Sequence, residues 1–182
     1  MREAGVRLGL IAMALCLGLG ACTGPEAPRP VARPMEVKHF PLDSLEEVRT
    51  TTGVSFDPTV SSDGKGSLRV DTKEPLLVPL FEITDVNIEN AVLLYQAHLQ
   101  SEKLDGQAYL EMWLRFPEKG EFFSRGLDHP MTGTMSWMLS STPFFLQAGQ
   151  KPDLIRLNLV VSGKGRVWID DVRLLRQPLP GR

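Results

Sequence analysis

Polar and aromatic side chains alternate with apolar ones through residues 95 to 116, the period-2 pattern of a strand with one face in a core. The polar face carries Gln96, His98, Gln100, Tyr109, Glu111, Trp113 and Arg115. Flat rings can stack on the C–H groups of a sugar, and amides and charged groups can bridge its hydroxyls. These residue types indicate a saccharide-binding surface. The alternative is a solvated sheet face with cross-strand pairs such as Trp113 over His98.

A second group of the same character occurs near the end of the chain. It consists of Arg156, Asn158, Trp168 and Asp170. The sequence leaves open whether the two groups share one sheet. A common groove for Trp113 and Trp168 would favour a ligand site, and separate surfaces would favour a structural role.

Catalytic residues are not recognisable. Ser124, Asp128 and His129 fall in one loop, whereas a catalytic triad is assembled from separate elements. The three histidines of the chain lack zinc-ligand spacing, and nothing fixes the distance between Glu111 and Asp170 as a carboxylate pair. We therefore expect a protein that is not an enzyme.

Two hairpins are predicted to position these side chains. Asp105-Gly106 is typical of a two-residue type I′ turn, which would place Tyr95 opposite Phe116 and Leu99 opposite Met112 in the core. The sequence Gly163-Lys164-Gly165 predicts a second hairpin that pairs Leu159 with Ile169 and Val161 with Val167.

A bulge is expected near the end of the second hairpin. Strict alternation would turn Asp171 into the core and Val172 and Leu174 out of it. A bulge at Asp170-Asp171 would return both apolar residues to the core. An inward Asp171 carboxylate would then need a partner, because an unpaired buried charge is costly.

Strand patterns separated by turn dipeptides recur from residue 36 onward, and the only helix-like stretch is short, Leu42 to Arg49. We predict one all-β domain, a β-sandwich, over residues 36 to 178. Residues 1 to 21 read as a signal peptide, with Arg2 and Arg7 before an apolar core that is too short to span a bilayer.

The signal ends in Leu19-Gly20-Ala21-Cys22. This stretch resembles a bacterial lipobox, which implies acylation of the Cys22 thiol. Diacyl and amide-linked chains on Cys22 would hold the protein on a membrane. Residues 22 to 35 form a proline-rich linker that can extend to about 40 Å at 3.1 Å per residue. Thr23 in place of Asp resembles an outer-membrane sorting signal. The alternative is an ordinary secretory signal in which Cys22 is incidental.

Charge and cysteine content exclude two further classes. A net charge of −2 with no basic stripe argues against a nucleic-acid partner. Cys16 leaves with the signal, so Cys22 would be the only cysteine of the mature chain and no internal disulfide can form. The domain must therefore be stabilised by its hydrophobic core.

Three segments resemble the galactose-binding-like jelly rolls, especially carbohydrate-binding modules of families 4, 9 and 22. The closing strand Gly165 to Leu174 carries Val-Trp-Ile-Asp-Asp-Val, the segment Asp63 to Val70 is similar to an early strand, and Trp137 precedes Pro143-Phe-Phe-Leu146. The similarity covers residues 36 to 176 and implies a jelly-roll β-sandwich. It implies less about function, because such jelly rolls also serve adhesive and structural roles.

The resemblance also implies a structural calcium ion. The matching candidates are Asp171, the segment Asp63 to Lys65, and Asp43. Calcium takes six to eight oxygen ligands, of which an inward Asp171 would supply one. The alternative is that Asp171 accepts backbone hydrogen bonds at the bulge or pairs with an arginine.

Together these features predict a lipid-anchored, non-catalytic binding module of the bacterial cell envelope, on the outer membrane, for a glycan or another envelope component. The ligand-binding candidates are Gln96, His98, Tyr109, Glu111, Trp113, Arg115 and Trp168. The alternative is a structural or protein-interaction lipoprotein without a sugar site, which docks a partner through its sheet face or through the Phe122-Phe123 loop.

Overall fold

The computed structural model describes residues 33 to 50 and 52 to 180. This part of the chain contains nine strands and no helix. The strands are β1 (Met35–Phe40), β2 (Val54–Asp57), β3 (Ser67–Thr72), β4 (Leu76–Thr84), β5 (Ala91–Phe116), β6 (Gly120–Arg125), β7 (Met131–Leu146), β8 (Leu154–Val161) and β9 (Lys164–Gln177). The predicted all-β class is confirmed. The predicted signal peptide, Cys22 and the linker up to residue 32 lie outside the described residues.

The short helix predicted over Leu42 to Arg49 is wrong. This segment consists of bends and turns, and its one internal backbone bond runs from Val48 N–H to the Leu45 carbonyl at 3.2 Å. Leu42 follows Pro41 and has a φ of 66°, so the backbone is left-handed where a helix would begin. No helix of the described residues is long and apolar enough to cross a membrane.

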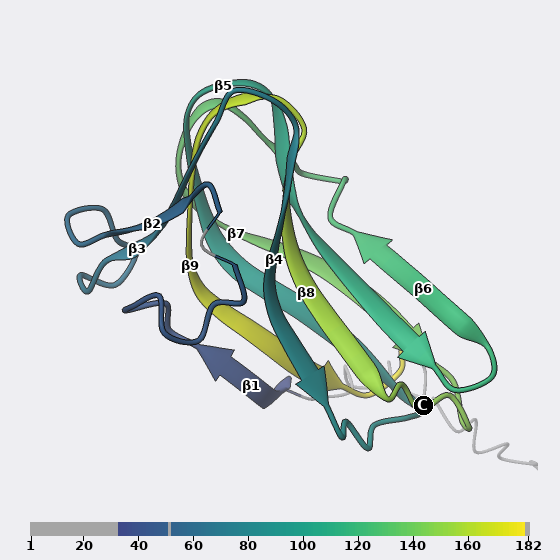
Figure 1. The fold of residues 1–182 in the computed structure, drawn as a ribbon. Coiled ribbons are helices and arrows are strands. Elements are labelled where there is room, and N and C mark those ends of the chain that lie inside the picture. Colours follow the sequence, from purple (N-terminus) through teal and green to yellow (C-terminus); the bar gives the residue numbers. More distant parts are fainter. Residues whose placement is uncertain (1–32, 51, 181–182) are drawn as a thin grey trace, which may run out of the picture. The chain divides into compact units, whose positions relative to one another are not determined.

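All nine strands belong to one sheet that curls over itself (Figure 1). The long strand β5 joins its two arms. Residues 92 to 105 pair with β9, whose other side pairs with β1 and β3, and residues 91 to 108 pair with β7. Residues 108 to 115 pair with β8, next to β4, and residues 111 to 116 pair with β6. We call β1, β2, β3, β9, the first half of β5 and β7 the first arm, and β4, β8, the second half of β5 and β6 the second arm.

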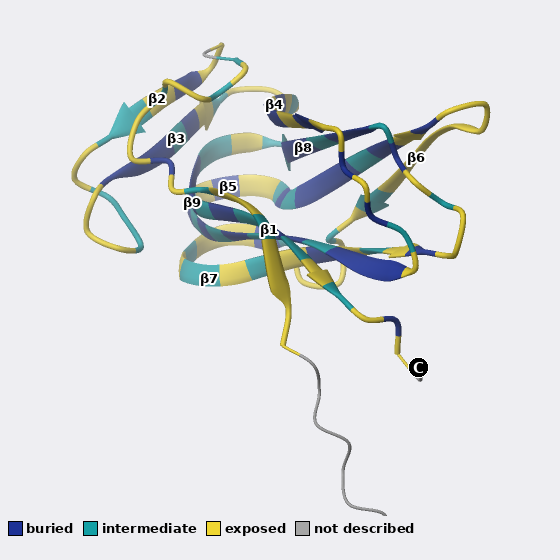
Figure 2. Cartoon of the chain, turned by 90° about the horizontal axis from the view of Figure 1, so that it is seen from below, coloured by how far each residue is buried: buried dark blue, intermediate teal, exposed yellow. Residues whose placement is uncertain are grey.

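The core lies between the two arms. Leu68, Tyr95 and Ile169 of the first arm and Met112 and Leu157 of the second are all 0% exposed and belong to one cluster. Figure 2 shows buried stretches along β3, β5 and β8, with exposed ones along β1 and β7. The outer faces of the two arms therefore point in opposite directions.

The predicted hairpin at Asp105-Gly106 is wrong, because β5 continues through this dipeptide. Leu104 lies opposite Gly133, and Gln107 lies opposite Thr132. The predicted inward residues are nevertheless buried, because a bulge in this region reverses the alternation as the turn was expected to do. Lys103, with a φ of 50°, marks that bulge.

The predicted hairpin at Gly163-Lys164-Gly165 is also wrong in its partners. In the described sheet β8 pairs with β4 and β5, whereas β9 pairs with β1, β3 and β5. Leu159 faces Leu110, and Ile169 faces Leu99. The turn instead crosses from one arm to the other and packs closely on β5. A Cβ atom at Gly163 would lie 1.8 Å from the Asp105 carbonyl oxygen, so only glycine fits there.

The predicted bulge in β9 is present. Asp171 has a φ of 50°, the pairing of β9 with β5 shifts between Gln96 and His98, and Val172 and Leu174 are fully buried. The buried carboxylate, however, is that of Asp170, which is 0% exposed, and not that of Asp171. Asp171 is the extra residue of the bulge, and its side chain stays 22% exposed.

Candidate functional site

The curl of the sheet divides the predicted ligand-binding residues into two groups. Glu111, Trp113, Arg115 and Tyr109 lie on the second half of β5, in the second arm. Gln96, His98 and Trp168 lie in the first arm, on β5 and β9. Because the outer faces of the arms point away from each other, the two groups do not form one groove. Their role in binding stays a prediction for each surface separately.

A buried carboxylate organises the outer face of the second arm. Glu111 is only 1% exposed, and its Oε1 accepts hydrogen bonds from Trp113 Nε1 at 2.6 Å and from Asn158 Nδ2 at 3.2 Å. Its Oε2 accepts a hydrogen bond from Arg125 Nε at 2.7 Å. This bond raises the pKa of Arg125 above its ordinary value. Strands β5, β6 and β8 thus each contribute a donor to one carboxylate, which fixes their side chains.

Two aromatic rings lie beside this carboxylate. Trp113 on β5 and Phe123 on β6 are paired across the strands, with ring centroids 5.0 Å apart and a 41° angle between the rings. Phe123 is 50% exposed, and the Arg125 guanidinium lies 4.5 Å from its ring centroid. The result is a partly exposed aromatic surface with fixed orientation. We call Glu111, Trp113, Phe123, Arg125 and Asn158 the aromatic surface.

A shallow hollow of about 380 Å³ adjoins the aromatic surface. Its lining residues are Arg49, Leu77, Pro79, Glu82, Trp113, Glu121, Arg156 and Asn158. Arg156 pairs with Glu82 at 3.3 Å and with Glu121 at 2.9 Å, and Arg49 also contacts Glu82. The charges at the rim are therefore matched. Such a rim presents donors and acceptors to an uncharged polyhydroxyl ligand without favouring an ion.

Arg115 contributes little to this hollow. Its guanidinium donates two hydrogen bonds to the Asp153 carboxylate, at 3.0 and 2.9 Å. These bonds raise the pKa of Arg115 and lower that of Asp153. Arg115 is thereby held against the loop before β8.

Sequence reasoning missed Phe123 and Arg125 as members of the site. The first part of the loop predicted to contain Ser124, Asp128 and His129 is instead strand β6, residues 120 to 125. The alternation of Glu121, Phe123 and Arg125 with Phe122 and Ser124 is the signal that could have indicated this strand.

Trp168 of the first arm is not an open platform. The residue is 5% exposed, its Nε1 donates to Asp57 Oδ2 at 3.0 Å, and the Arg166 guanidinium lies 5.5 Å from its ring centroid. The hydrogen bond from Trp168 is the largest reason why the pKa of Asp57 falls to about 2. A hollow of about 510 Å³ lies next to Trp168 and Arg69, but the indole itself offers little surface to a ligand.

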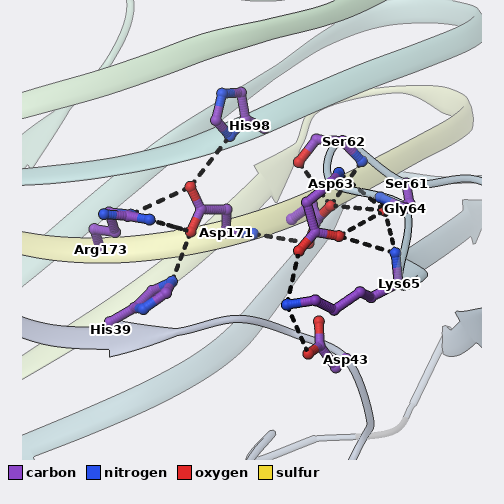
Figure 3. Close-up of polar contacts among 11 residues, drawn as sticks. His39, Asp43, Ser61, Ser62, Asp63, Gly64, Lys65, His98, Asp171 and Arg173 are labelled. Atoms are coloured by element: carbon purple, nitrogen blue, oxygen red, sulfur yellow. Dashed lines mark hydrogen bonds and ion pairs between the residues drawn. The ribbon is translucent and has the colours of Figure 1, made fainter.

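The predicted calcium ligands are engaged by cations of the protein (Figure 3). Asp171 lies 2.6 Å from His39 Nε2 and 3.0 Å from Arg173 Nη2. Burial raises the pKa of Asp171, but the hydrogen bonds from Arg173 and His39 outweigh it and hold this pKa below its ordinary value. Asp171 thus takes the alternative that the sequence left open, pairing with an arginine.

The other two candidates share one lysine. Lys65 Nζ lies 3.3 Å from Asp63 and 3.8 Å from Asp43. Within residues 33–50 and 52–180, no three His, Cys, Asp or Glu side chains converge as a metal ion requires. The arrangement of these residues therefore does not fit calcium, and chelation tests whether an ion binds here.

Hydrogen bonds also connect the buried Asp170 to the loop between β2 and β3. The buried Asp170 Oδ2 accepts from Ser62 N–H at 2.8 Å and from Ser62 Oγ at 2.7 Å, and Oδ1 accepts from the Asp171 N–H at 2.9 Å. These hydrogen bonds attach the loop between β2 and β3 to β9.

Ser124, which the sequence places near Asp128 and His129, forms hydrogen bonds to β7 instead of to these two residues. Ser124 Oγ lies 2.6 Å from Thr142 Oγ1 and donates to the Pro143 carbonyl oxygen at 2.6 Å. Among the described residues, no hydrogen bond joins Ser124 to Asp128 or His129.

Comparison of the structure with known ones identifies the fold. The xylan-binding family 22 module of Paenibacillus barcinonensis Xyn10C superposes with a TM-score of 0.53 at 16% identity, covering 81% of this chain and 99% of that one. The C-terminal family 22 module of Clostridium thermocellum Xyn10B has a TM-score of 0.53 at 10% identity, with coverages of 82% and 96%. The fold is the galactose-binding-like jelly roll of carbohydrate-binding modules.

A family 16 carbohydrate-binding module is also similar to this jelly roll, with a TM-score of 0.50 at 12% identity and coverages of 67% and 84%. No protein-family model matches the sequence, and no curated protein matches it. The structural likeness confirms the predicted jelly-roll class. At these sequence identities it is evidence for the fold alone.

Proposed function

We propose that this jelly roll is a non-catalytic carbohydrate-binding module whose site is the aromatic surface of the second arm. One observation carries the proposal: Trp113 and Phe123 present a partly exposed pair of rings, and a hydrogen bond to the buried Glu111 holds Trp113 in its orientation. Sugar rings stack on such surfaces through their C–H groups. The solved structures with the same fold include xylan-binding modules, which supports this assignment.

Orientation of the ligand would come from the polar groups around the rings. Asn158 and Arg125 hold Glu111, and Arg156 stands between Glu82 and Glu121 at the neighbouring hollow. These groups are held by one another before a ligand arrives, so little side-chain entropy is lost on binding. The surface is open rather than enclosed, which suits a saccharide chain lying across the strands.

We further propose that the module is anchored on the bacterial envelope by lipid on Cys22, with residues 22 to 35 as its linker and the outer membrane as its location. The sequence at residues 19 to 22 supports the anchor. Labelling cells with a tagged palmitate tests it: wild type should carry the label, and Cys22→Ser should lose it. Equal label on both would overturn the anchor and leave the sugar site untouched.

A glycan array with residues 33 to 182 tests the sugar site, because every residue of the core cluster lies in this range. Binding to a defined saccharide class that is lost in Trp113→Ala would support the proposal. An array without any binding would favour the second candidate function, a structural or protein-interaction lipoprotein. The placement of Trp113 and Trp168 on separate surfaces and the exposure of Phe122, at 48%, favour that candidate.

A further inference from the structure

Apolar side chains gather on the outer face of the first arm, where water would otherwise be expected. Phe145 and Leu139 of β7 are 52% and 54% exposed. Pro143, between them on the same face, is exposed, and its cross-strand partner Leu94 pairs in turn with Leu175 of β9. We call Leu94, Leu139, Pro143, Phe145 and Leu175 the linker-side patch. Pro143 and Phe145 lie side by side on this face, and Leu139 follows beyond Ser141. Exposed apolar side chains that gather on one face in this way mark an interaction site.

The patch lies directly beside the point where the linker reaches the domain. The second residue of β1, Glu36, pairs with Leu175, so Glu36, Leu175, Leu94 and Pro143 form one row across four adjacent strands. Strands lie about 4.8 Å apart, so the row spans about 15 Å. Figure 1 shows β1 beside β9 in this arm. The linker therefore enters the domain at the end of the row that contains Leu175, Leu94 and Pro143.

Basic residues border the same end of the arm. Arg33 and Arg176 line a small hollow with Met35, which is 67% exposed. No ion pair within the described part of the chain engages Arg33 or Arg176. Met35 and Arg176 form the row next to that of Leu175, so the alternation of the strands turns them to the other face of the sheet. These cations therefore lie at the end of the arm that carries the patch, where they can meet lipid phosphate.

We infer that the linker-side patch docks on the lipid surface to which Cys22 is anchored, an inference that rests on the proposed lipid anchor. Thr23 to Pro34 would keep the domain within about 40 Å of the bilayer, where even a weak contact is populated because the local concentration of lipid is high. The docked first arm turns the aromatic surface of the second arm away from the membrane. Docking thus presents the sugar site to the space in front of the membrane.

Site-directed fluorescence on the full acylated chain in vesicles of phosphatidylethanolamine and phosphatidylglycerol tests this docking. The mature chain has no cysteine other than the acylated Cys22, so Ser141→Cys, between Leu139 and Pro143 on β7, provides one labelling position within the patch. Leu77→Cys on the outer face of the second arm, where the wild-type residue is 47% exposed, is the matched control.

We expect a label at position 141 to lose its access to aqueous iodide and to be quenched by spin-labelled lipid, while a label at position 77 stays open to iodide. Adding Phe145→Glu to the Ser141→Cys chain should restore access to iodide, because a carboxylate opposes entry into the acyl boundary. Equal access at positions 141 and 77, or shielding of both, would overturn the docking. A preparation without palmitate label would overturn the anchor and the docking with it, whereas glycan binding is measured independently of both.

Discussion

Trp113 Nε1 donates a hydrogen bond to Glu111 Oε1 at 2.6 Å, although the two residues are neighbours on one face of the same strand. The bond links a partly exposed ring to a carboxylate that is 1% exposed. Arg125 on β6 and Asn158 on β8 donate hydrogen bonds to the same carboxylate. The orientation of the Trp113 ring is therefore fixed by contacts from β5, β6 and β8. The rigidity of the proposed sugar platform is therefore a property of the buried Glu111.

Replacing Glu111 with Ala should lower both affinity and stability. The variant leaves the Asn158 amide and the Trp113 N–H without their acceptor, which costs about 1 to 3 kcal/mol. Urea denaturation measures this cost. The control is Arg115→Ala, because Arg115 pairs with Asp153, which is not part of the aromatic surface. A Glu111→Ala variant as stable as wild type would mean that the carboxylate does not organise the surface.

Tyr95 carries a buried hydroxyl that has no hydrogen-bond partner among the described residues. Burial raises the pKa of Tyr95 far above its ordinary value, so the group stays neutral. Removing an unsatisfied polar group of a buried side chain is neutral or stabilising. Tyr95→Phe should therefore be at least as stable as wild type in a thermal melt. A marked loss of stability would reveal a partner for the hydroxyl in solution.

Chelation should leave the melting temperature of the domain unchanged. A ligand that binds only the native state stabilises it, so calcium at Asp171 would make the melt sensitive to both calcium and chelator. Since Asp171 pairs with Arg173 and His39, we expect no response. Ser62→Ala should instead destabilise the domain by about 1 to 3 kcal/mol, because the buried Asp170 loses a donor. A melting temperature that falls on chelation and recovers with calcium would reinstate the ion.

The pKa of Asp57 gives a pH-dependent prediction. It is lowered from 3.8 to about 2, chiefly by the hydrogen bond from Trp168. A carboxyl group whose pKa is lower in the folded state stabilises the fold at any pH above its pKa in the unfolded chain. This contribution is lost as the pH falls from about 4 to 2. Trp168→Phe should raise the pKa of Asp57 in a carbon-detected NMR titration and weaken the dependence of stability on pH in that window. Trp113→Phe, on the other arm, should leave the titration of Asp57 unchanged.

The alternation of residue types predicted the faces of β5 but not its partners. Tyr95, Leu99, Met112 and Leu114 are buried as expected, because period-2 patterning is a local property of the strand. The dipeptide Asp105-Gly106 is equally compatible with a tight turn and with the bulge that is present. The choice between them is made by β9 and β8, which pair with successive halves of one long strand.

Contacts between segments far apart in the sequence were the second source of error in predicting the site. The bulge in β9 was predicted, yet the buried carboxylate is Asp170 and not Asp171, because the loop residue Ser62 covers the former. Such a contact across more than a hundred residues leaves no local pattern. The same holds for Arg125 and Phe123, whose place in the site depends on β6 lying beside β5.

Calorimetry on Trp113→Ala and Leu114→Ala, with the saccharide that the glycan array identifies, tests the central claim most directly. Trp113 is partly exposed on the aromatic surface, whereas its neighbour Leu114 is 0% exposed in the core. We predict that Trp113→Ala stays folded but loses binding, and that it costs about 1 to 3 kcal/mol of stability because the buried Glu111 loses a donor. Leu114→Ala should cost about 2 to 5 kcal/mol of stability. Undiminished saccharide binding by a folded Trp113→Ala variant would contradict the account.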